Sequence, residues 1–154
     1  MAIWKNTVSL DQLNAMRANT MIGTLDIQIT EIGDDYVRGT MPVDARTHQP
    51  YGLLHGGASV SLAETLGSIC AMLCCDPKTE RAVGLDINAN HMRAVTSGRV
   101  TGTARPIHVG RSTQVWEIRI EDEAGKLVCI SRLTTIVVPA QAIPGGKLER
   151  AQGT

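Results

Sequence analysis

The sequence contains no phenylalanine, and its aromatic residues are two tryptophans and two tyrosines, 3% of the chain. Proteins that bind single-stranded nucleic acid stack bases on aromatic side chains, so this scarcity argues against that class. The 15 basic and 15 acidic residues cancel, and a chain without net charge lacks the cationic field that contacts to phosphate backbones require. We therefore expect no nucleic-acid partner and a core built from aliphatic side chains.

The sequence also lacks a long uninterrupted hydrophobic run. Its most apolar stretch, residues 58–75, contains three serines, a threonine and Glu64, whereas a membrane span needs about 20 nearly continuous apolar residues. Near the N-terminus no apolar run follows the charge of Lys5, so this segment does not resemble a signal peptide. We expect a cytoplasmic protein with no membrane partner.

The four cysteines do not have the spacing of a known framework. They are Cys70, Cys74, Cys75 and Cys129, which match neither a C-x-x-C zinc pair nor the regular pattern of a secreted disulfide-bonded domain. Reduced, buried thiols are typical of cytoplasmic proteins. We expect no disulfide and no metal site.

A chain of 154 residues has the usual size of one domain, and 43% hydrophobic residues suffice for a buried core. We expect a single domain over residues 1–139. The remaining segment, residues 140–154, contains Pro144-Gly145-Gly146, which predicts a flexible C-terminal tail.

Hydrophobic periodicity predicts two helices and six strands. Ser9 and Gln12 have capping-box spacing and begin a short helix over residues 9–16. Residues 58–75 are apolar on most sides, which is typical of a buried helix. Alternating patterns predict strands over residues 25–30, 37–43, 83–90, 100–104, 115–120 and 126–138.

The order of these elements determines the expected fold class. Consecutive strands without intervening helices imply an antiparallel sheet. The prediction is therefore an α+β fold, in which a long curved antiparallel sheet surrounds one central buried helix. Because one helix cannot cover both faces of six strands, we also expect a homo-oligomer.

A 14-residue loop, residues 44–57, precedes the central helix, and loops of this length are uncommon unless they are functional. It ends in His55-Gly56-Gly57. Glycine lets a ligand approach the backbone, and the N–H groups of a first helical turn suit a developing negative oxygen. The alternative is that these glycines only mark the transition from loop to helix and bind no ligand.

Glu64 lies in the middle of this most apolar helix, where an unpaired carboxylate is costly to bury. Ser61, Glu64 and Ser68 fall on one stripe of the helix. The spacing alone leaves open an ordinary solvent-facing stripe. Together with the glycines at the start of the helix, however, a carboxylate and an oxyanion site are expected for acyl transfer to water.

These residues resemble the hot-dog-fold acyl-CoA thioesterases, in particular the phenylacetate-pathway type. The resemblance extends over about residues 3–138 and therefore implies the hot-dog fold. The two motifs that carry it are Tyr51-Gly52-Leu53-Leu54-His55-Gly56-Gly57-Ala58 and Leu62-Ala63-Glu64-Thr65. Further matching stretches are residues 14–16, 33–35, 41–44, 84–91 and 131–135.

The resemblance implies a role for each residue of the motif. Glu64 corresponds to the carboxylate that acts as nucleophile or general base on the thioester carbon. Gln49 and the Gly56 N–H correspond to groups that polarise the thioester carbonyl. His55 helps to place the thioester, and Ser68 orients the attacking water or the carboxylate.

The resemblance also implies the substrate and the assembly. The substrate is an acyl-CoA with an aromatic acyl group, such as hydroxybenzoyl or 1,4-dihydroxy-2-naphthoyl, or with a medium-length chain; acyl-carrier-protein thioesters are also accepted by relatives. No cofactor or metal is needed, since CoA is part of the substrate. The active sites form at a dimer interface, in a homodimer or a homotetramer of two dimers.

Two segments correspond to the part of the family that holds CoA. Taken alone, the loop at residues 108–113 reads as a solvated hairpin with incidental charge, and the family resemblance is what favours a role in binding. The expected contacts are Gly84, His91, Met92, Arg93, Ala94, His108, Val109, Gly110, Arg111, Ser112 and Thr113.

Two other function classes remain open at this stage. A hydratase or dehydratase on acyl thioesters also pairs a histidine with an acidic residue for proton transfer. A non-catalytic protein of the same fold would bind acyl-CoA without turnover. A Cys–His hydrolase is disfavoured because the cysteines lie in an apolar helix or strand.

Overall fold

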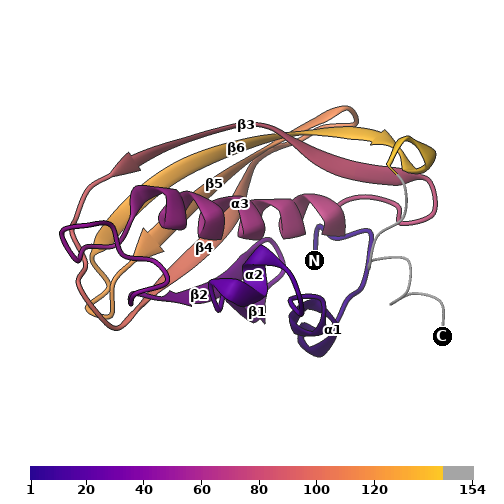
Figure 1. The fold of residues 1–154 in the computed structure, drawn as a ribbon. Coiled ribbons are helices and arrows are strands. Elements are labelled where there is room, and N and C mark those ends of the chain that lie inside the picture. Colours follow the sequence, from indigo (N-terminus) through magenta and orange to yellow (C-terminus); the bar gives the residue numbers. More distant parts are fainter. Residues whose placement is uncertain (144–154) are drawn as a thin grey trace.

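A computed structural model describes residues 1–143 of the chain, and Figure 1 shows one curved sheet above a single long helix. The sheet is antiparallel throughout, with strand order β1-β2-β4-β5-β6-β3. This confirms the predicted α+β class and the hot-dog arrangement. The elements are α1 (Leu10–Ala15), α2 (Met21–Thr24), β1 (Gln28–Ile32), β2 (Val37–Pro42), α3 (Gly56–Leu73), β3 (Glu80–His91), β4 (Arg99–Val109), β5 (Thr113–Glu121), β6 (Leu127–Pro139) and the 3-10 turn η1 (Ala140–Ala142).

The central helix α3 forms the core with the concave face of the sheet. Leu62, Leu66 and Cys70 on the helix are fully buried, as are Trp116 and Leu133 on the strands. The helix is long and apolar enough to cross a membrane, but half of it is buried in the protein. It is therefore the core helix of this fold, as predicted from its apolar circumference.

The N-terminal segment confirms one prediction and corrects another. The Ser9 and Gln12 side chains accept hydrogen bonds from each other's backbone N–H, at 3.1 and 2.9 Å respectively, and so form the predicted capping box. The strand expected over residues 25–30 is wrong at its start, because α2 ends at Thr24 and Asp26 has a left-handed backbone with φ of 50°. The alternation of polar and apolar residues does not reveal this bend in the chain, because the bend depends on the backbone dihedral angles of a single residue.

Two other boundaries also shift. The helix α3 begins at Gly56 rather than at residue 58, so both glycines lie in its first turn. Strand β4 continues to Val109 because His108 and Val109 pair with β5, and the predicted loop shrinks to residues 110–112. Residues 144–154, which hold most of the predicted tail, lie outside the described part of the chain.

Strand β3 lies at one edge of the sheet, beside β6 alone. It has 12 residues, and its middle is exposed, with Val83 at 38% and Leu85 at 59%. A long, exposed, partly hydrophobic edge strand offers unpaired backbone groups to another strand.

Candidate functional site

The polar stripe of α3 faces a cavity of about 680 Å³. Ser61, Glu64, Thr65 and Ser68 all line it, which confirms that the predicted stripe shares one face. Residues of α1, α2 and β1 form one wall, and the start of β3 forms another. The stripe therefore faces a concave site rather than a flat solvated surface.

The Glu64 carboxylate is partly buried and lies against the backbone of β3. A Cβ placed on Gly84 would lie 2.8 Å from Glu64 Oε1, so glycine at this position leaves room for the carboxylate. Within residues 1–143, no hydrogen bond or ion pair engages the Glu64 carboxylate or the Ser68 hydroxyl. In contrast, the hydroxyls of Ser61 and Thr65 donate to helix carbonyl oxygens at 2.8 and 2.7 Å.

The N-terminal end of α3 is built by the predicted His-Gly-Gly segment. His55 is the N-cap, and its Nδ1 accepts a hydrogen bond from the Gly57 N–H at 2.8 Å. The Gly56 N–H has no acceptor among residues 1–143, which leaves it available to a ligand. A Cβ on Gly56 would lie 2.6 Å from Nε2 of His91, so the end of β3 lies against the start of the helix.

Gln49 belongs to the loop that leads to this helix. Its backbone N–H donates to the Leu53 carbonyl at 2.8 Å, and its side-chain Oε1 accepts from the Tyr51 N–H. Tyr51 itself is 89% exposed. The loop is thus ordered by its own hydrogen bonds and presents an aromatic side chain at its tip.

One chain does not bring the predicted catalytic residues to a single point. Gly56 and Glu64 are eight residues apart on a helix, about 12 Å along its axis, whereas one reacting carbon must lie about 3 Å from both nucleophile and oxyanion donor. Gln49, His55 and Gly56 do not line the cavity that Glu64 faces. Within one chain the two halves of the expected site are therefore too far apart to act on one carbon, and the active site expected at a dimer interface stays a prediction.

Apart from Gly84 in the middle of β3, the predicted CoA contacts also separate into two groups. Met92 and Arg93 follow the end of β3, where their N–H groups donate to the Val128 carbonyl at 2.7 and 3.3 Å. Arg111 lies in the turn beside Val137, near the start of β3. At about 3.3 Å per residue, the 12 residues of β3 separate the two groups by roughly 35 Å.

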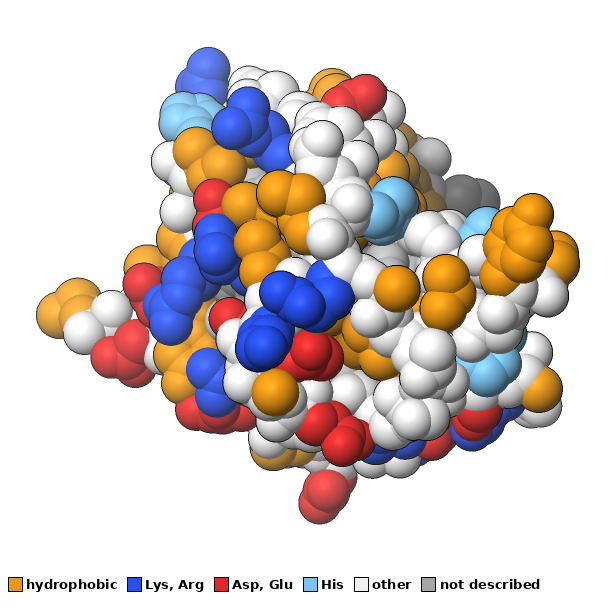
Figure 2. Space-filling model, turned by 90° about the vertical axis from the view of Figure 1, so that its left-hand side faces the viewer, with side chains coloured by type: hydrophobic (Ala, Val, Ile, Leu, Met, Phe, Trp, Pro, Cys, Tyr) orange, Lys and Arg blue, Asp and Glu red, His pale blue; other side chains and the backbone are white. Residues whose placement is uncertain are grey.

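The surfaces at the two ends of β3 carry different side chains. Figure 2 shows the end of the molecule with the loop 44–55, where basic and histidine side chains lie among hydrophobic ones. His91, Met92, Arg93 and Ala94 are all exposed. At the other end, Arg111 shares a cavity of about 270 Å³ with Lys5 and Glu80.

The cysteines have the properties of packed thiols. All four are buried and unpaired with one another, and burial raises the pKa of each, that of Cys74 to about 11. A thiol in this state is not a nucleophile at neutral pH. In the described part of the chain, no group of three histidine, cysteine or acidic side chains is placed to hold a metal ion.

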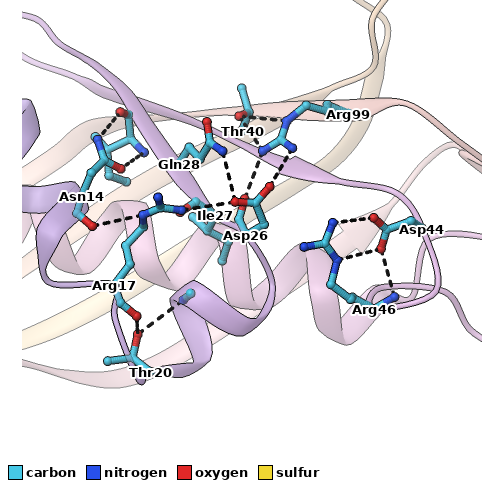
Figure 3. Close-up of polar contacts among 12 residues, drawn as sticks. Asn14, Arg17, Thr20, Asp26, Ile27, Gln28, Thr40, Asp44, Arg46 and Arg99 are labelled. Atoms are coloured by element: carbon cyan, nitrogen blue, oxygen red, sulfur yellow. Dashed lines mark hydrogen bonds and ion pairs between the residues drawn. The ribbon is translucent and has the colours of Figure 1, made fainter.

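A dense polar cluster surrounds Asp26, and sequence reasoning did not find it (Figure 3). The Asp26 carboxylate accepts hydrogen bonds from Gln28 at 3.1 Å, from Arg99 at 3.1 Å and from Arg17 at 3.3 Å. These bonds, led by that from Gln28, lower the pKa of Asp26. The donors come from α1–β1 and β4, so no local pattern reveals the cluster, which ties the N-terminal helices to the sheet.

Comparisons with known proteins agree with the fold. Residues 51–129 match the family model described as the thioesterase superfamily. The chain is 54% identical over 136 residues to the 1,4-dihydroxy-2-naphthoyl-CoA hydrolase of Escherichia coli (strain K12), an alignment that covers 88% of this chain and 99% of that protein. It is 51% identical over 136 residues to the proofreading thioesterase EntH of Cronobacter turicensis, covering 88% and 98%. The crystal structure of a thioesterase from Haemophilus influenzae superposes with a TM-score of 0.86 at 51% identity, covering 89% of this chain and 95% of that one.

Proposed function

Because the chain belongs to the thioesterase superfamily, we propose that it hydrolyses acyl-CoA thioesters at Glu64, in a site that a second copy of the chain completes. Both named relatives are thioester hydrolases, and the Escherichia coli relative is named for an acyl-CoA substrate. We therefore favour hydrolysis over the hydratase and the non-catalytic binding protein considered above. The acyl group named for the Escherichia coli relative makes an aromatic acyl-CoA our proposed substrate.

The observation that carries this proposal is the carboxylate of Glu64, which faces the cavity beside Gly84 without a protein partner in residues 1–143. Such a carboxylate is available to attack the thioester carbon itself or to take a proton from an attacking water. In the general-base route Glu64 takes one proton from water, the water oxygen adds to the acyl carbon, the C–S bond breaks, and the CoA sulfur takes up a proton. In the nucleophilic route a Glu64 oxygen displaces the CoA thiolate and forms a mixed anhydride. Water then hydrolyses the anhydride to the free acid and restores Glu64, while the thiolate takes up a proton.

The second copy is needed because the oxyanion donor is out of reach in one chain. About 12 Å along α3 separates Glu64 from Gly56, and the Glu64 side chain is too short to close that gap. We propose that the partner subunit supplies Gly56 and Gln49 to the Glu64 of the first. Losing one such donor typically lowers turnover by about 10²–10³-fold.

The exposed edge of β3 is the surface proposed for this dimer. Two copies that pair their β3 strands about a two-fold axis extend the sheet and cover Val83 and Leu85. Pairing in this antiparallel sense brings the Arg93 end of one β3 toward the Arg111 end of the other. The two groups of predicted CoA contacts then meet across the interface, and two such dimers would form the tetramer implied by the family resemblance.

Mixed dimers test both parts of the proposal. Glu64→Gln and Gln49→Ala are each expected to abolish most release of free thiol from aryl-CoA esters. When the two variants are co-expressed with different tags, half of the dimers are mixed, and each mixed dimer holds one intact site. Activity should therefore return to about a quarter of the wild-type value.

The outcomes separate the two parts. No recovery on mixing, with both single variants inactive, would show that one chain supplies the whole site and would overturn the shared site. Near-normal turnover in Glu64→Gln alone would overturn the role of Glu64.

A further inference from the structure

Two hydroxyl groups on the core face of β6 are buried without a hydrogen-bond partner. Among the described residues, the fully buried side-chain oxygens in this situation are Ser131 Oγ and Thr135 Oγ1, and the two residues are only 3% and 1% exposed. A buried polar group without a partner costs free energy and is rare in folded proteins, so each case needs an explanation. The position of Thr135 in the sheet provides one.

Thr135 lies beside the candidate active site. It pairs directly with Gly84 across the β3–β6 ladder, and residues paired in this way have their Cβ positions about 5 Å apart on one face of the sheet. The Cβ position of Gly84 is itself 2.8 Å from Glu64 Oε1. The Thr135 hydroxyl and the Glu64 carboxylate are therefore neighbours on the core face of the sheet.

The β3–β6 ladder is irregular at this point. The register shifts between Gly84 and Asp86, so Leu85 is an extra residue without its own partner on β6. Bulges of this kind are frequent next to active sites, where they redirect side chains. The bulge and the missing side chain of Gly84 both fall beside Thr135, and together they leave room for a group from the helix.

We propose that Thr135 is a positioning residue, whose hydroxyl donates a hydrogen bond to the Glu64 carboxylate during turnover. This inference rests on the proposed hydrolysis at Glu64. The carboxylate has acceptor oxygens without a donor and the hydroxyl has a donor without an acceptor, and a turn of the Glu64 side chain within its cavity would join them. A carboxylate has two oxygens, so one that is held by Thr135 leaves the other for the thioester carbon or for water.

Thr135→Val removes the hydroxyl and keeps the branched shape of the side chain. The kcat for thiol release from an aryl-CoA ester should fall by about 10–100-fold, as expected for the loss of a hydrogen bond to a charged group, while KM changes less than threefold. The thermal midpoint should not fall, because the variant removes a buried hydroxyl that has no partner in the folded chain. Thr135→Ala, which also lacks the hydroxyl, should show the same fall in kcat and covers the case in which valine does not pack.

Two control variants separate the hydroxyl from the packing of the side chain. Thr135→Ser keeps the hydroxyl and should retain kcat within about threefold of the wild type. Ser131→Ala removes the other buried hydroxyl on the same face of β6, which pairs with Ala89 and lies about 13 Å along the strand from Thr135. This variant should leave kcat unchanged.

A double-variant cycle shows whether Thr135 acts through Glu64. In a Glu64→Gln background, Thr135→Val should lower the residual rate by less than about threefold, because no carboxylate remains to be positioned. A hydroxyl that only supported the fold would cost the same factor in both backgrounds.

Three results would overturn the role of Thr135 while hydrolysis at Glu64 stands. They are a kcat of Thr135→Val within threefold of the wild type, an equal loss of kcat in Thr135→Ser and Thr135→Val, and an equal effect of Thr135→Val in both backgrounds. Near-normal turnover in Glu64→Gln alone would instead overturn the proposed function, and this inference with it.

Discussion

Two carboxylates of this protein, those of Asp26 and Glu64, differ in whether they have hydrogen-bond partners. Asp26 accepts hydrogen bonds from three side chains, two of which are arginines, and these contacts lower its pKa (Figure 3). Glu64 lines a cavity without any such partner in residues 1–143. Asp26, whose carboxylate is fully hydrogen-bonded, connects elements of the fold, whereas the Glu64 carboxylate has free acceptor oxygens that are available to a substrate.

Exchanging each carboxylate for its amide should separate activity from stability. Glu64→Gln should lower turnover of acyl-CoA by about 10³-fold or more, because the amide can neither attack nor accept a proton. Asp26→Asn should change turnover by less than about threefold. Steady-state thiol release with both variants checks this, and a comparable loss in both would remove the distinction.

A substitution at Gly84 tests how accurately the Glu64 carboxylate must be positioned for turnover. The methyl group of Gly84→Ala would approach Glu64 Oε1 to 2.8 Å and displace the carboxylate. A displacement of about 1 Å can cost 10²-fold in rate, so kcat should fall by about 10–100-fold while the thermal midpoint stays near that of the wild type. In a Glu64→Asp background, which shortens the side chain, the same methyl group should cost much less. A rise in KM with unchanged kcat would instead indicate that Gly84 contacts CoA.

Asp26→Asn should show its effect in stability. Asparagine tolerates the left-handed backbone at this position, but it loses the charge that two arginines neutralise. We expect a loss of about 1–3 kcal/mol at pH 7. The folded pKa of Asp26 is lowered, so its contribution is present above the unfolded pKa of about 4. It is lost as pH falls through the folded value.

Chemical denaturation of Asp26→Asn and the wild type at several pH values checks this prediction. The difference in unfolding free energy should be constant from pH 5 to neutrality and should shrink below about pH 4. A difference in unfolding free energy that persists unchanged at low pH would show that the charge of Asp26 does not account for its contribution to stability.

The same contrast between paired and unpaired groups applies to the arginines. Arg17 and Arg99 are paired with Asp26, whereas within residues 1–143 neither Arg93 nor Arg111 has an ion pair. Arg93→Ala and Arg111→Ala should each raise KM for CoA esters several-fold, because a charge-assisted bond to phosphate is lost. Pantetheine thioesters, which lack the nucleotide, should be unaffected, and the exposed control Lys126→Ala should change neither. Equal losses on both substrates would reject the phosphate role.

The parts of the fold that follow from local patterns were predictable. The capping box of α1, the central helix and the six strands rest on contacts between near neighbours or on a periodic face, and the structure confirms them within a few residues. The stripe of Ser61, Glu64 and Ser68 was predictable for the same reason, because the helical repeat alone puts these residues on one side. The polar cluster at Asp26 was not predictable, since the two arginines that donate to its carboxylate lie 9 and 73 residues away.

Local patterns in the chain were enough to predict the kind of protein: an antiparallel sheet around an apolar helix, with one acidic group in that helix and a glycine-rich start. The folded structure was required to show that Glu64 lines a cavity that Gly56 does not line, and that Arg93 and Arg111 lie at opposite ends of β3. Periodicity identifies which residues share a face, because that depends on local geometry. Which faces meet depends on how distant strands pair and where the sheet leaves an edge, and those relations exist only once the chain has folded.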